Sequence, residues 1–136
     1  EPALAVLNSL RAGARMCGAK HFAAVAALRW DARLNASARS FAGELARRDT
    51  LSHQGQVLRS LRERLHASGY VLRTAGENLA AGPTDLDEAL QQWLLSREHC
   101  ENLMLSDFRD VGLACVAGPG RYERFWVLHL GRSAAE

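Results

Sequence analysis

Apolar residues recur with the period of an amphipathic helix in two long stretches of the N-terminal half. One face of the first stretch collects Ala3, Leu7, Leu10 and Ala14. In the second, Asp31 is a typical N-cap, and apolar residues follow at positions 34, 38, 41 and 45. We therefore expect helices over about residues 3–14 and 31–48, joined by a loop that passes through Cys17.

The middle of the chain has a shorter pattern. Leu58, Leu61 and Leu65 predict a helix over about residues 57–68 that stops at Gly69. It follows a predicted loop, residues 49–56, which carries His53. Residues 70–75 are compatible with a strand and lead to a turn at Gly82-Pro83.

The C-terminal third begins with a second capped helix. Asp85 with Glu88 resembles a capping box, and the apolar stripe that follows reaches Trp93. A short helical segment is expected over residues 99–105. Residues 110–117 and 121–130 read as strands of a hairpin around Gly118-Pro119-Gly120. Helices flanking a small antiparallel sheet predict the α+β class.

Composition changes this picture little. The 136 residues suit one domain spanning 1–136, and 48% apolar with 24% charged residues is ordinary globular composition. The net charge of +2 is scattered, which disfavours a nucleic-acid partner, and no apolar run approaches the ~20 residues of a transmembrane helix.

Three fragments carry residues suited to chemistry. They are Leu51-Ser52-His53, the stretch Gly76-Glu77-Asn78-Leu79-Ala80, and the run from Trp93 through Ser96 to His99. Two imidazoles and a carboxylate that meet in one cleft can hold a divalent metal or move a proton. Ser96 and His99 are three residues apart, so one helical turn would also permit a serine-type arrangement with Glu77 as orienting acid.

Read in order, these fragments resemble the CAP superfamily, also called the SCP-like extracellular domain, and its short bacterial members in particular. The resemblance includes Val6-Leu7-Asn8-Ser9-Leu10-Arg11 and Leu28-Arg29-Trp30-Asp31 as well, and it spans nearly the whole chain. It implies an α-β-α sandwich of about four helices around a small antiparallel sheet. It also implies an exported protein, so that a chain starting at Glu1 is expected to be a mature secreted or periplasmic form.

The resemblance further implies a cavity with two histidines and acidic groups, in some members able to bind zinc. His53 matches the first histidine, Glu77 the acid, and His99 the second histidine. Many eukaryotic members have another glutamate where this chain has Ser96, so less negative charge is expected here. We expect His53, His99 and Glu77 to take zinc with modest affinity. The remaining histidines, His21, His66 and His129, are expected to be structural or exposed.

Cys17, Cys100 and Cys115 allow one disulfide and one free thiol. A Cys17–Cys100 bond would tie the loop after the first helix to the segment with His99, whereas Cys100–Cys115 would tie that segment to a strand. The residues alone leave both open. The resemblance to bacterial CAP proteins favours Cys17–Cys100.

Three functions remain open from the sequence. The first is a monomeric binding module for an unknown envelope or extracellular ligand. The second is a lipid-, sterol- or protein-binding module in which the His–Glu cluster only braces the fold. The third is a weak metal- or serine-type hydrolase with candidates His53, Glu77, Ser96 and His99.

Overall fold

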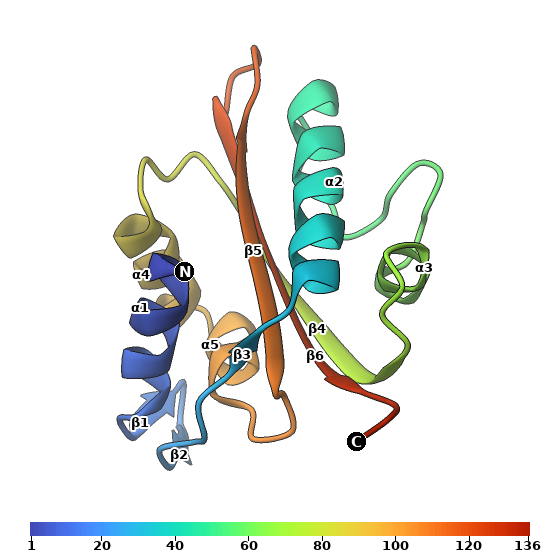
Figure 1. Cartoon of the computed structure of the whole chain (residues 1–136). Coiled ribbons are helices and arrows are strands. Elements are labelled where there is room, and N and C mark those ends of the chain that lie inside the picture. The colour runs from blue at the N-terminus through green and yellow to red at the C-terminus, as the bar shows by residue number, and fades with distance from the viewer.

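A four-stranded sheet in the order β3-β5-β6-β4 divides the molecule (Figure 1). The short β3 is parallel to β5, and the pairs β5–β6 and β6–β4 are antiparallel. The computed structural model describes the whole chain, and a separate hairpin of β1 and β2 lies outside the sheet. The strands are β1 (Arg15–Cys17), β2 (Lys20–Phe22), β3 (Arg29–Trp30), β4 (Leu72–Ala81), β5 (Asp110–Ala117) and β6 (Arg124–Ser133). Strand β4 is consequently an edge of the sheet.

Helices cover both faces of this sheet, which confirms the predicted α-β-α sandwich. In Figure 1, α2 and α3 lie on one side of the strands and α1, α4 and α5 on the other. The helices are α1 (Pro2–Arg11), α2 (Ala32–Arg48), α3 (Leu61–Ala67), α4 (Leu86–Leu95) and α5 (Arg97–Met104). None of them combines the length and the apolar character that a membrane crossing requires.

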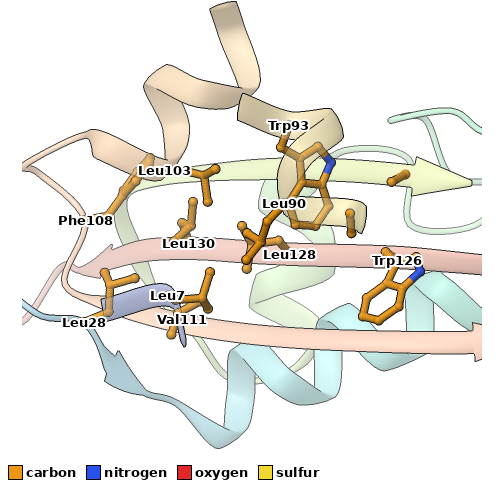
Figure 2. Close-up of a cluster of buried hydrophobic side chains, with 12 residues drawn as sticks. Leu7, Leu28, Leu90, Trp93, Leu103, Phe108, Val111, Trp126, Leu128 and Leu130 are labelled. Atoms are coloured by element: carbon orange, nitrogen blue, oxygen red, sulfur yellow. The ribbon is translucent and has the colours of Figure 1, made fainter. Parts of the chain in front are cut away.

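Alternation along β6 fills both halves of the core. Leu128 and Leu130 point into the cluster beneath α1 and α4, where Trp93 is 1% exposed (Figure 2). Phe125 and Val127 point to the opposite face and pack against α2. Every residue of this strand from 125 to 131 is therefore buried.

The alanine-rich helix α2 packs directly against the sheet. Gly112 on β5 makes this possible, because a Cβ atom there would lie 2.2 Å from the backbone nitrogen of Asn35. The predicted start of the helix is confirmed: Asp31 accepts hydrogen bonds from the amides of Arg33 and Leu34.

Several predicted boundaries were wrong for local reasons. The first helix ends at Arg11 rather than near residue 14. The third begins at Leu61 rather than at residue 57, because Ser60 and Glu63 form a capping box there. The strand expected over residues 70–75 instead covers 72–81, so the Gly76–Ala80 motif lies within it. The last strand starts at Arg124 rather than at 121, after Glu123 with φ 68°.

Candidate functional site

The site is built around a buried carboxylate, Glu77, in the edge strand β4. Its side chain lies on the α2–α3 face of the sheet and is 3% exposed, whereas its neighbour Asn78 faces the other layer. Burying an ionised carboxylate is costly unless it is paired and hydrogen-bonded. Its partners therefore define what this site can do.

Both oxygens of Glu77 are fully engaged. Oε1 lies 2.7 Å from Nδ1 of His53, and Oε2 lies 2.7 Å from Nε2 of His129. Nη2 of Arg64 donates to both oxygens, at 3.0 and 2.9 Å. Burial alone would raise the pKa of Glu77, but the hydrogen bonds from His129 and His53, together with the Arg64 charge, outweigh it and lower the pKa to about 2. Glu77 is thus a carboxylate at any physiological pH.

Arg64 connects the carboxylate to the loop between α2 and α3. Its Nη2 also donates to the carbonyl of His53 at 2.9 Å, and its Nη1 to the carbonyls of Leu58 and Arg59 at 3.2 and 3.4 Å. The guanidinium carbon lies 3.7 Å from the ring centroid of Phe41 on α2. Sequence reasoning missed Arg64, since an arginine in a short polar helix reads as a surface residue.

His129 holds the carboxylate from the neighbouring strand. It is the cross-strand partner of Glu77 and is fully buried. Burial lowers the pKa of His129 despite the hydrogen bond to Glu77, so the ring is neutral at pH 7 and its Nε2–H donates to Glu77. Its Nδ1 lies 2.7 Å from Oγ of Ser37 on α2. The expected structural role is therefore correct, although its contact with Glu77 was missed.

His53 presents the opposite case, a ring that faces solvent. Its side chain is 63% exposed. Its Nδ1–H donates to Glu77, and Nε2 has no hydrogen-bond partner in the protein. The hydrogen bond to Glu77 raises the pKa of His53, while partial burial and the Arg64 charge oppose that rise. The sequence prediction that His53 and Glu77 meet is confirmed by this contact.

His99 reaches the same region from the other helical layer. Its carbonyl accepts a hydrogen bond at 3.1 Å from Nδ2 of Asn78, the residue after Glu77, and Asn102 donates to Asn78 at 2.9 Å. Burial lowers the pKa of His99, and the charge of the nearby His53 lowers it further. Helix α5 lies on the face of the sheet opposite to α2 and α3 (Figure 1), so His99 and the side chain of Glu77 belong to different layers. The His99 ring itself makes no hydrogen bond to Glu77.

Ser96 lies at the junction of α4 and α5. Its side chain does not cap α5, and it makes no hydrogen bond to His99.

Two adjoining pockets open beside His53. The larger, which we call the His53 cleft, has a volume of about 550 Å³. It is lined by His53, Gln54, Arg59, Ser60, Leu61, Arg64, Ala75, Gly76 and Glu77. The smaller, the Arg59 pocket, measures about 330 Å³, shares Gln54 and Arg59 with the cleft, and has no apolar lining residue. Nowhere in the chain do three or more His, Cys, Asp or Glu side chains cluster in a way that could hold a metal ion.

A disulfide between Cys17 and Cys100 anchors the helix that carries His99. The two Cα atoms are 5.5 Å apart, and Cys115 is the free cysteine. This confirms the pairing favoured by the family resemblance. It attaches α5 to the β1–β2 hairpin one residue after His99.

Comparisons with known proteins agree with this architecture. The YkwD protein of Bacillus subtilis is 28% identical over 89 residues, which is 65% of this chain and 35% of that protein. An extracellular SCP-domain protein of Bacillus anthracis superimposes with a TM-score of 0.71 at 29% identity, over 80% of this chain and 35% of that one. The chain thus spans about a third of the length of these two relatives.

A more distant protein, NaASP2, has been solved with Zn²⁺. It covers 94% of this chain, and this chain covers 76% of it, with a TM-score of 0.62 at 15% identity, so it shows a shared fold. The profile of the cysteine-rich secretory protein family, CAP, matches residues 4–130. The chain therefore belongs to the CAP family.

Proposed function

We propose that this chain is an exported binding module whose ligand site is the His53 cleft. We further propose that His53 at this cleft binds a divalent metal, zinc in particular, together with His99, which is not among the residues that line the cleft. The observation that carries the proposal is the 2.7 Å contact between Nδ1 of His53 and the buried Glu77. Metal-binding histidines are commonly oriented by a carboxylate on their other ring nitrogen, and this contact leaves Nε2 available.

The donor set fits zinc in part. Both oxygens of Glu77 already accept hydrogen bonds, so we place Glu77 behind the His53 ring rather than on the ion. The lowered pKa of His99 keeps that imidazole neutral, as metal binding requires. Two imidazoles leave coordination positions for water or an external ligand, so we expect modest affinity.

Export is supported by two observations. The Cys17–Cys100 disulfide is typical of oxidising compartments. The similar Bacillus anthracis protein is described as extracellular. We therefore propose a secreted or periplasmic location.

The alternatives have less support. The lining of the His53 cleft includes only Leu61 and Ala75 as apolar residues, which does not favour lipid at this place. Ser96 makes no hydrogen bond to His99, so the serine-type hydrolase lacks the contact that it requires.

Calorimetric zinc titration of the metal-free protein tests the proposal. We expect weak binding that is abolished in His53→Ala and in His99→Ala, and retained in His66→Ala, which removes an exposed histidine of α3 as a matched control. Glu77→Gln should weaken binding by roughly 10- to 100-fold, the usual effect of removing an orienting carboxylate. Equal heats of zinc binding in all variants would refute the proposed metal site.

A purely structural cluster predicts a different pattern. In that case His53→Ala lowers the melting temperature, and the wild type gives no saturable heat with zinc. Measuring both quantities on the same samples distinguishes the two roles.

A further inference from the structure

Arg59 is a cationic side chain without a partner at the junction of the two pockets. It lines both the His53 cleft and the Arg59 pocket. Its guanidinium makes no hydrogen bond or ion pair with any group of the protein. The other two arginines of these pockets are engaged, because Arg64 binds Glu77 and Arg48 binds Glu44.

The one carboxylate that lines these pockets does not pair with Arg59. Glu77 is the only acidic residue that lines either pocket, and both of its oxygens are occupied. Glu44, which lies outside both pockets, accepts through Oε2 from Arg48 at 2.8 Å and from the backbone N–H of Gln56 at 3.0 Å. Glu63, also outside both pockets, accepts through Oε1 from the backbone N–H and the hydroxyl of Ser60 in the capping box.

Uncharged donors lie next to Arg59. The side-chain amides of Gln54 and Gln56 line the Arg59 pocket and make no hydrogen bonds within the protein. A guanidinium presents two parallel N–H groups that match the two oxygens of a carboxylate or phosphate. The Arg59 pocket therefore combines an arginine that has no ion-pair partner with two free side-chain amides, a set of donors that suits an oxyanion.

We propose that the Arg59 pocket binds the anionic group, a carboxylate or a phosphate, of the ligand that occupies the His53 cleft. Arg59 forms the charged contact, and Gln54 and Gln56 donate the remaining hydrogen bonds. This inference rests on the proposed function in one respect, that the His53 cleft is the ligand site. It does not require a bound metal.

The test is a titration of the metal-free protein with sodium phosphate, sodium acetate and sodium chloride at matched ionic strength, followed by the backbone amide signals in NMR spectra. We expect saturable shifts confined to residues 52–61 with phosphate or acetate, and none with chloride. Whichever oxyanion shifts these signals identifies the chemical class. Shifts with all three salts alike, or with none, overturn the proposal.

Two charge-matched variants complete the test. Arg59→Gln should weaken the binding of the oxyanion by about 5-fold or more, because it removes a charge-assisted pair. Arg62→Gln, an exposed residue of α3 outside both pockets, should leave it within about 2-fold. Equal losses in both variants would show a general charge effect and overturn the site.

Failure of this inference can be told from failure of the metal proposal. If zinc binds but no oxyanion does, only the Arg59 pocket is refuted. If oxyanions bind to the wild type and zinc does not, only the metal site is refuted. Loss of both would refute the His53 cleft as the ligand site.

Discussion

Replacing Arg64 by methionine should destabilise the protein more than any change on the surface of the same helix. The Arg64 side chain is 4% exposed and donates both to Glu77 and to the carbonyls of the loop that carries His53. Methionine keeps the apolar stem but leaves Glu77 as a buried charge without its permanent cation. Removing one partner of a buried ion pair costs about 3–5 kcal/mol of unfolding free energy.

This loss should be visible in ordinary unfolding experiments at pH 7 with the disulfide intact. For a domain of this size each kcal/mol lowers the melting temperature by roughly 3–5 °C, so Arg64→Met should lower it by roughly 9–25 °C. The exposed Arg62→Met is the control, and its change should stay within about 0.5 kcal/mol. The double variant Arg64→Met/Glu77→Gln should be less destabilised than the sum of the single variants by about 2 kcal/mol.

A loss below about 1 kcal/mol in Arg64→Met would refute the reasoning, because breaking a buried charge pair costs several times that amount. It would mean that the two imidazoles alone satisfy Glu77. Additivity in the double variant would likewise show that Arg64 and Glu77 are not energetically coupled.

Three further predictions concern stability. The pKa of Glu77 is lowered from 4.5 to about 2, so its ionised form adds about 3 kcal/mol to the free energy of unfolding above pH 4.5, and this contribution is lost as the pH falls towards 2. In acid unfolding experiments, the stability of Glu77→Gln should lack this dependence on pH. The guanidinium of Arg11 is buried, with the residue 1% exposed, and it donates only to backbone carbonyls. Arg11→Met should therefore lower the free energy of unfolding in urea by about 3 kcal/mol, and Arg11→Lys should not restore it. Reducing the Cys17–Cys100 bond, which spans 83 residues, should cost roughly 4.5 kcal/mol by loop entropy, measured with and without reductant; no change would contradict that entropy estimate.

Local signals predicted the elements well where the cause was local. The helix that begins after Asp31 has its cap, its apolar stripe and its alanines in one continuous segment, and the structure matches it. The predicted start of the third helix is wrong because Leu58 continues the apolar spacing upstream of the true start at Leu61. The capping box of Ser60 and Glu63 determined its start instead.

The site could be predicted only in part, because its partners depend on strand register. The resemblance to CAP proteins predicted that His53 and Glu77 meet, and the structure confirms their contact. The pairing of β4 with β6 places His129 opposite Glu77, and no sequence spacing reveals that register. A histidine inside the apolar run 125–130 was still a usable signal, since a buried imidazole needs a polar partner.

The protonation of the His53 ring tests most directly the claim that Glu77 holds this histidine with Nε2 facing the cleft. Long-range ¹H–¹⁵N spectra of the imidazoles, recorded at pH 8 with ¹⁵N-labelled protein, distinguish the two neutral tautomers. The account predicts that His53 carries its proton on Nδ1 and that Glu77→Gln removes this preference. A His53 ring protonated on Nε2 in the wild type, unchanged by the substitution, would contradict it.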